Sequence, residues 1–309
     1  MKRAVSVSIG SSTRDKSVEV ELLGERIQIE RIGTDGDMAR AAALFQSLDG
    51  QVDALGVGGA DLGLDVAGRW YPLHSVSSLV AGVHHTPVVD GAGLKNTLEA
   101  RLADYLDENL PERITLRRAL ITSGADRWGM TVSFTEAGYQ CVFGDLMFAL
   151  GVPIPLHSAA SLKRLARWLV PVVSRLPFQW LYPTGEAQEK RTPKWERYYQ
   201  WATVIAGDCH YIKRHLPDHL PGKIVVTNTT TPSDVALFRQ VGIRYLVTST
   251  PVLDGRSFGT NMMEAALVAL AGKGRPLDRQ ELSELIDRLG LTPQLHDLGP
   301  AAVNAPAEA

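Results

Sequence analysis

The chain has 309 residues, of which 45% are hydrophobic and 21% charged, and its formal net charge at pH 7 is -2. This length allows about two domains with separate cores, and the composition is ordinary for a globular protein. A charge so close to zero, without a stripe of Lys and Arg, excludes a general attraction to nucleic acid. Cys141 and Cys209 form no CxxC pair, so we expect neither a disulfide framework nor a bound metal.

The chain also lacks the apolar runs that direct a protein to a membrane. Charged residues, Pro or Gly interrupt each apolar stretch before the roughly 18 residues that a membrane span needs, and no signal-peptide core follows Met1. We therefore expect a cytoplasmic protein with a small-molecule substrate and no membrane partner. The oligomeric state stays open, with a homodimer as one option.

The first 95 residues alternate short apolar runs with turns. "RAVSVSIG" has the period of a strand, and "SVEVELLG" followed by "ERIQIERIG" predicts a hairpin that turns at Gly24–Glu25. Asp37 is placed to cap a helix over 38–48. "VDALGVGG" and "TPVVDGAG" predict two more strands. This alternation indicates an α/β domain.

A helix from Leu94 to Asn109 is expected to join this domain to the next, which places the division near residue 110. We predict an N-terminal substrate domain over 1–110 and a nucleotide-binding domain over 111–309. The second domain carries a helical insertion near 146–201, where "SLKRLARWLVPVVSRL" predicts an amphipathic cover helix. Its β-branched runs, mostly separated by helical stretches, predict a Rossmann-like, doubly wound parallel sheet: "RRALITS", "YQCVFGD", "WATVIAGD", "GKIVVTNTT" and "IRYLVTST".

The segment "ITSGADRWGMTVSFTEAGYQCVFGD" has much of a dinucleotide-binding fingerprint. Gly124 and Gly129 have the spacing of its first and third glycines, and Asp126 stands in place of the second. Arg127 could offset the charge of that carboxylate. Asp145 ends the next strand, where an acid binds the adenosine ribose and favours NAD over NADP. The alternative, a structural turn in which Asp126 caps the helix, stays open.

Polar residues follow three further strands, at Gly207-Asp208, at 227–231 and at 248–250. Ligands of doubly wound sheets bind at the carboxyl ends of strands, so these groups predict a polar ligand lying across the row. The residues that we assign to the cofactor from this row are Asn228, Thr229 and Thr250.

Lys95 is the candidate general acid–base residue, because a lysine near a carboxylate can move a proton on an alcohol or ketone. Asp90, at a strand end just before it, is the candidate acid. We assign three residues to substrate binding: Asn96, which follows Lys95, and His210 and Arg256, which lie much later in the chain. The alternative is that Lys95 and Arg256 are solvated surface residues with no role in catalysis or binding.

Motifs along nearly the whole chain resemble a bacterial family labelled quinate 5-dehydrogenase-like. They are "SVSIGSS", "ERIGTDGD", "DALGVGGADL", "TPVVDGAGLKNTLE", "FGDLMFALGVPIPL", "LYPTGEAQEKRTPK", "VIAGDCHYIKR" and "VTNTTTPSDV". The resemblance implies NAD(P)-dependent oxidation of a polyhydroxylated cyclohexane carboxylate, with a substrate domain before a nucleotide domain.

The resemblance also implies particular site residues. Quinate and shikimate dehydrogenases use a lysine followed later in the chain by an aspartate, and a pair of serines near the N-terminus that bind the substrate carboxylate. Lys95 matches the lysine, and Ser6 and Ser8 match the serines. The candidate acids Asp35 and Asp90 both precede Lys95, which departs from the family order.

These observations favour an NAD(P)-dependent oxidoreductase acting on a small hydroxy acid or its ketone, with NAD as the favoured cofactor. A non-catalytic, regulatory protein that binds a nucleotide or metabolite is the alternative. A transferase or lyase that binds a phosphorylated substrate through the Thr and Asn row is a further one.

Overall fold

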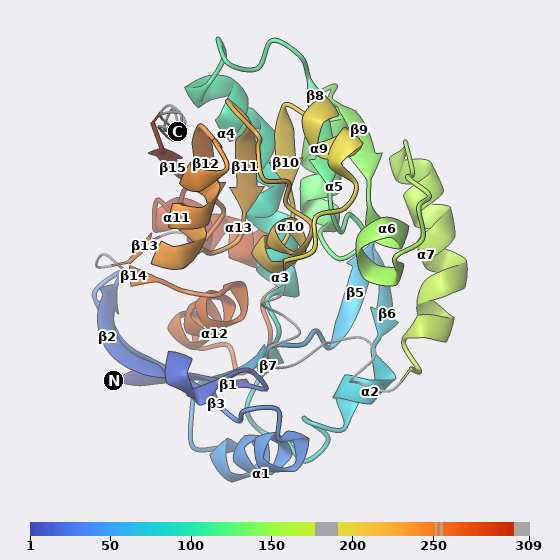
Figure 1. The fold of residues 1–309 in the computed structure, drawn as a ribbon. Helices are drawn as coiled ribbons and strands as arrows, with labels where there is room; N and C mark the ends of the chain where they lie inside the picture. Colours follow the sequence, from blue (N-terminus) through green and yellow to red (C-terminus); the bar gives the residue numbers. More distant parts are fainter. Residues whose placement is uncertain (177–190, 251, 254–255, 300–309) are drawn as a thin grey trace, which may run out of the picture.

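The computed structural model describes residues 1–176, 191–250, 252–253 and 256–299, with 252–253 and 256–257 described as backbone alone. The chain folds into two α/β halves, each built on its own largely parallel sheet (Figure 1). Within the described residues, no helix is both long and apolar enough to cross a bilayer.

The first sheet has the strand order β2-β3-β1-β4-β7. β1 pairs in parallel with β3 and β4, β4 pairs in parallel with β7, and β2 forms the expected antiparallel hairpin with β3. The strands are β1 (Lys2–Ser8), β2 (Lys16–Leu22), β3 (Glu25–Gly33), β4 (Ala54–Gly58) and β7 (Val88–Val89). Leu23 and Gly24 turn this hairpin with positive φ angles of 52° and 81°.

The second sheet has the order β15-β12-β11-β10-β8-β9, and all its strands except β15 run in parallel. Numbered along the chain, the five parallel strands lie in the order 2-1-3-4-5, the flavodoxin-like form of a doubly wound sheet. The Rossmann-like parallel sheet is therefore confirmed. The strands are β8 (Arg118–Ile121), β9 (Gln140–Phe143), β10 (Val204–Ala206), β11 (Ile224–Thr227), β12 (Tyr245–Thr248) and β15 (Gln294–Asp297).

Two small hairpins lie outside these sheets: β5 (Gly63–Val66) with β6 (Arg69–Pro72), and β13 (Val252–Leu253) with β14 (Arg256–Ser257). The described helices up to residue 110 are η1 (Ser12–Arg14), α1 (Met38–Leu48), α2 (His74–Ser77), α3 (Ala92–Thr97), η2 (Glu99–Arg101) and α4 (Leu102–Asn109). The described helices after residue 110 are α5 (Trp128–Glu136), α6 (Asp145–Leu150), α7 (Ala159–Val173), α9 (Glu196–Trp201), α10 (Cys209–Arg214), α11 (Pro232–Gln240), α12 (Thr260–Ala271) and α13 (Arg279–Arg288).

Two local expectations meet different outcomes. Asp37 caps α1 by accepting a hydrogen bond from the N–H of Arg40, as its position predicted. The single helix expected from Leu94 to Asn109 is wrong, because α3, η2 and α4 replace it. Lys95 of α3 and Glu99 of η2 are both buried.

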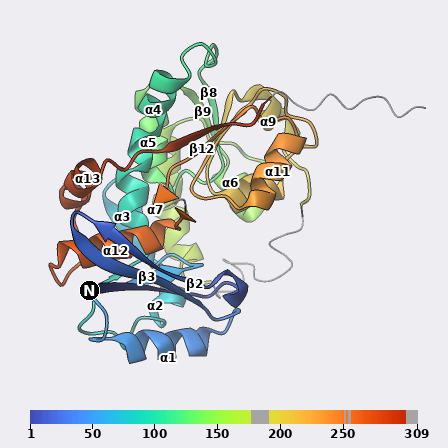
Figure 2. The ribbon, with the colours of Figure 1, turned by 90° about the vertical axis from the view of Figure 1, so that its left-hand side faces the viewer.

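The first sheet is covered on its two faces by helices from opposite ends of the chain. α1 packs on one face, where Phe45 joins Val5 and Val57 in one core cluster. α12 packs on the other face and lies between the first sheet and the second half of the molecule (Figures 1 and 2). The division near residue 110 stays a prediction, while residues 258–291 belong to the core beneath the first sheet.

Helices also cover both faces of the second sheet. Met130 and Phe134 of α5 pack with one set of strand residues, and Ile212 and Phe238 pack with the alternate set. Because the strand order reverses between β8 and β10, the carboxyl ends of these two strands form the switch point where doubly wound sheets bind ligands.

Candidate functional site

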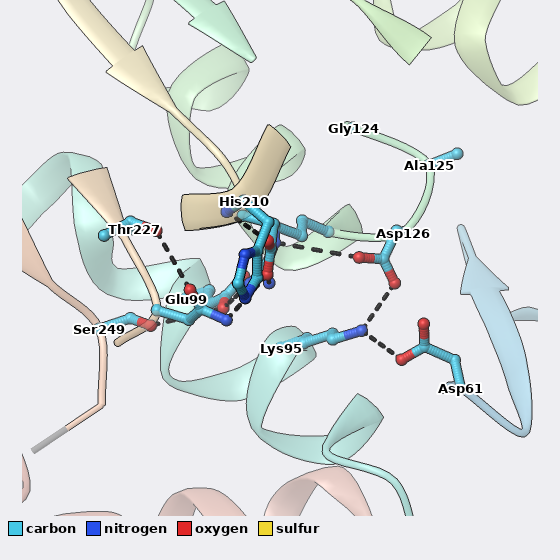
Figure 3. Close-up of polar contacts among 12 residues, drawn as sticks. Asp61, Lys95, Glu99, Gly124, Ala125, Asp126, His210, Thr227 and Ser249 are labelled. Atoms are coloured by element: carbon cyan, nitrogen blue, oxygen red, sulfur yellow. Dashed lines mark hydrogen bonds and ion pairs between the residues drawn. The ribbon is translucent and has the colours of Figure 1, made fainter. Parts of the chain in front are cut away.

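Lys95 lies next to this switch point and is held by two carboxylates. Its Nζ donates to Oδ1 of Asp61 at 2.6 Å and to Oδ1 of Asp126 at 2.7 Å (Figure 3). The lysine side chain is 8% exposed, while Asp61 and Asp126 are 19% and 23% exposed. Asp61 follows β4 of the first sheet and Asp126 follows β8 of the second, so Lys95 links the two halves.

The three charges shift one another's proton affinity. Burial alone would lower the pKa of Lys95, but attraction by Asp126 and Asp61 outweighs burial and raises it above its ordinary value. Burial, opposed by Lys95 and reinforced by Asp126 and Asp90, raises the pKa of Asp61 to about 6. Asp61 therefore takes up a proton as the pH falls through about 6. Lys95 itself stays protonated.

A second, deeper ion pair adjoins this group. Arg127 and Glu99 are 2% and 1% exposed, and Nη1 of Arg127 donates to Oε1 of Glu99. Nη2 of Arg127 contacts Oδ2 of Asp208 at 3.1 Å. Burial would lower the pKa of Arg127, but Glu99 and Asp208 raise it, so this cation is fixed.

The row of polar strand ends meets this pair. Asp208 caps α10, and its Oδ2 accepts from Nδ2 of Asn228 at 3.0 Å. The hydroxyl of Thr250 donates to the carbonyl of Asn228 at 3.0 Å, and Thr229 is half-buried beside them. His210, labelled in Figure 3, is exposed at the start of α10, and its backbone N–H donates to Oδ1 of Asp208 at 2.8 Å. The structure thus brings the predicted row together with Arg127.

The other residues expected near Lys95 have different contacts. The carboxylate of Asp90 accepts from the N–H groups of Leu62 and Ala92 at 2.7 and 2.9 Å, so it supports the backbone while Asp61 and Asp126 bind Lys95. Asn96 lies on α3 against Gly129 of α5.

Ser6 and Ser8 are buried and engaged by their own protein. Oγ of Ser6 accepts from Nδ2 of Asn261 at 2.5 Å, and Oγ of Ser8 accepts from Nη2 of Arg31 at 2.8 Å. The first bond ties β1 to α12, and the second ties β1 to β3. These contacts account for both hydroxyls without a substrate.

The turn from Gly124 to Gly129 does not fit a dinucleotide as placed. Both oxygens of Asp145 accept from this turn, from the N–H groups of Gly124 at 3.0 Å and Ala125 at 2.8 Å. A pyrophosphate would need these N–H groups, and the ribose would need Asp145. Asp126 is committed to Lys95 and does not cap α5, whose N-cap is Arg127.

The remaining expectations concern Arg256 and metals. Arg256 lies in β14, and its side chain is outside the described residues. Among the residues that the structure describes, no group of three or more His, Cys, Asp and Glu is placed to hold a metal ion.

Sequence reasoning missed two residues of the site. Asp61 follows the strand motif "ALGVG" by three residues, and Glu99 lies four residues after Lys95 in "LKNTLE". A carboxylate just beyond a buried strand was the available signal for Asp61. An acid among apolar helix residues, one turn from Lys95, was the signal for Glu99.

The chain has low similarity to several solved structures. An NAD-dependent malic enzyme from Thermotoga maritima is 13% identical with a TM-score of 0.37, covering 92% of this chain and 75% of that one. A periplasmic sugar-binding protein from Legionella pneumophila is 13% identical with a TM-score of 0.37, covering 95% and 97%. A glucose-galactose binding protein from Geobacillus stearothermophilus is 8% identical with a TM-score of 0.35, covering 96% and 97%. At these values the likeness carries no argument about function.

Family models give a firmer result. No curated protein matches the chain. The model described as domain of unknown function DUF8753 matches residues 3–90, and the one described as domain of unknown function DUF8754 matches residues 93–298. Because the second match spans more than half of the 309 residues, the chain belongs to the DUF8754 family.

Proposed function

We propose that the protein is an enzyme that transfers a proton to or from a hydroxyl or carbonyl group of a small substrate. The observation that carries this proposal is the placement of Lys95 between Asp61 and Asp126 at the switch point of the second sheet. A fixed ammonium can donate a hydrogen bond to a substrate oxygen, while a carboxylate with a pKa near 6 exchanges the proton.

The charge at the site favours an uncharged group of the substrate. Among the residues that the structure describes, the carboxylates of Asp61, Glu99, Asp126 and Asp208 adjoin the buried cations Lys95 and Arg127. A second anion placed beside Asp61 and Asp126 would be repelled, whereas a hydroxyl can donate to either carboxylate. A carboxylate of a hydroxy acid would therefore have to lie away from this pair.

Oxidation of an alcohol or reduction of a ketone is one reaction of this class. The resemblance to quinate and shikimate dehydrogenases supports it, because Asp126 follows Lys95 in the chain as in their dyad. A nicotinamide dinucleotide would have to bind through groups other than the Gly124–Gly129 turn. The strand ends at Asn228, Thr229 and Thr250 offer hydroxyl and amide groups for such binding.

The proposal predicts that Lys95→Met cuts turnover by about two to four orders of magnitude, because it removes the hydrogen-bond donor and the cation that Asp61 and Asp126 share. Small polyols, hydroxy acids and ketones are incubated with the protein in D2O, with and without NAD and NADP. NMR detects deuterium entering a C–H position next to a carbonyl, which spontaneous exchange of hydroxyl protons does not give, and absorbance detects reduction of the dinucleotide. Lys273→Met, which removes an exposed ion pair with Glu281, is the matched control.

The same assay tests Asp61. Turnover that needs ionised Asp61 should rise with pH through about 6, and Asp61→Asn should abolish that limb of the profile. Full activity in Lys95→Met would refute the proposal. Binding of a compound without turnover would favour the non-catalytic metabolite-binding protein instead.

A further inference from the structure

The turn after β8 already holds an anion, and that anion is part of the chain. The N–H groups of Gly124 and Ala125 converge on the two oxygens of Asp145, one N–H to each oxygen, at 3.0 and 2.8 Å. Successive backbone N–H groups that converge in this way form the concavity that binds phosphate in nucleotide sites. Here the carboxylate occupies the position that a phosphate would take.

The glycines of this turn are explained by close packing. A Cβ on Gly124 would lie 2.8 Å from side-chain atoms of Leu162, Phe143 and Thr131. A Cβ on Gly129 would lie 2.2 Å from the carbonyl oxygen of Lys95. Both glycines therefore let neighbouring elements approach, which is a sufficient reason for them without a bound cofactor.

Within the part of the chain that the structure describes, the cations beside the turn are already paired with carboxylates. Asp126, in the middle of the turn, is paired with Lys95, and the guanidinium of Arg127 is directed to Glu99 and Asp208. A phosphate at the turn would meet the carboxylates of Asp126 and Asp145, while Lys95 and Arg127 are engaged by carboxylates of the chain itself.

We propose that Asp145 is a built-in anion that closes the Gly124–Gly129 turn, so that this turn stabilises the fold and does not bind nucleotide phosphate. The carboxylate links α6 to the β8–α5 turn across the edge of the second sheet. The proposal does not rest on proton transfer at Lys95 and survives if that function fails.

The test compares the wild-type protein with Asp145→Ala. The variant should lose thermal stability, because two N–H groups lose their acceptor. Inorganic phosphate should then raise the melting temperature of Asp145→Ala more than that of the wild type, since the emptied concavity accepts an anion. Affinities for NAD and ADP, measured by calorimetry, should be no weaker in the variant than in the wild type. Asp53→Ala, which removes another carboxylate bonded to a backbone N–H, is the control.

Two results would overturn the proposal. The first is a ten-fold or greater loss of NAD or ADP affinity in Asp145→Ala, which would make the carboxylate a ligand of the nucleotide. The second is an equal response of variant and wild type to phosphate. If Asp145→Ala does not fold, Asp145→Asn, which keeps one oxygen acceptor, is measured in the same way. Neither result bears on Lys95, so the two proposals fail separately.

Discussion

Arg127 shows how a single residue couples the site to the stability of the fold. Its guanidinium is buried with Glu99 and also contacts Asp208, which in turn binds Asn228. Nε of Arg127 and Oε2 of Glu99 have no hydrogen-bond partner among the described residues. Such a pair costs much to desolvate, so its presence indicates a role in fixing Asp208 and Asn228 more than a gain in stability.

Removal of one partner should therefore be far more damaging than removal of both. Arg127→Met is expected to lower the free energy of unfolding by about 3–5 kcal/mol, because it leaves Glu99 buried and uncompensated. Adding Glu99→Leu should recover much of this loss. Chemical denaturation measures both variants, with Arg117→Met as the control, since its pair with Asp107 is partly exposed and worth about 0–1 kcal/mol. Equal losses in the single and double variants would contradict this explanation.

At the scale of elements, α3 is the part that carries Lys95, and two other helices fix its place. Gly129 lets α5 approach the backbone of α3 at Lys95. From α12, Oε2 of Glu264 accepts from the N–H of Leu94 at 3.2 Å. α3 has only six residues and depends on these neighbours, because so short a helix is unstable alone.

Glu264 should make the stability of this arrangement depend on pH. Burial, then repulsion by Asp90, raises its pKa from 4.5 to about 8. Between pH 4.5 and about 8, the Glu264 carboxyl is therefore protonated in the folded protein but ionised in the unfolded chain. The stability that this bound proton contributes is lost as the pH rises through about 8. Glu264→Gln should flatten this fall in the free energy of unfolding. At about 1.4 kcal/mol per pKa unit, the fall amounts to several kcal/mol at most.

Thermal unfolding from pH 5 to pH 9 measures the effect, with Glu284→Gln on the exposed face of α13 as the control for loss of one carboxylate. A wild-type stability that rises over this range, unchanged in Glu264→Gln, would show that Glu264 is ionised in the folded protein.

At the scale of the whole molecule, the two halves depend on each other. Ala4, Ile27 and Ile29 of the first sheet share one core cluster with Met263 and Leu267 of α12. The hairpin β5–β6 packs on α7, where Tyr71 contacts the cluster of Ala166 and Val170. Each half needs residues from the other to complete its hydrophobic core. We therefore expect the chain to fold as one cooperative unit.

A fragment of residues 1–110 should therefore not fold by itself, because the apolar face that α12 covers would be exposed to water. Circular dichroism and NMR of the isolated fragment should show little native structure or aggregation. Production together with residues 111–309 should restore a native-like complex. A well-dispersed NMR spectrum of the fragment alone would show that the first sheet is independent.

The sequence by itself determined the local elements and the type of fold. β-branched runs marked the five parallel strands, a cap marked α1, and alternation with helices predicted the parallel sheet that β8, β10 and β11 form. These features depend on residues close together in the chain, whose periodicity and capping preferences are local.

Only the tertiary structure decided which groups meet. Lys95 finds Asp61 from 34 residues before it and Asp126 from 31 residues after it, and Asp145 turns to the N–H groups of Gly124 and Ala125. α12 reaches the first sheet from the far end of the chain. No periodic pattern encodes such pairings, because they follow from how separate elements pack and which buried charges must then be compensated.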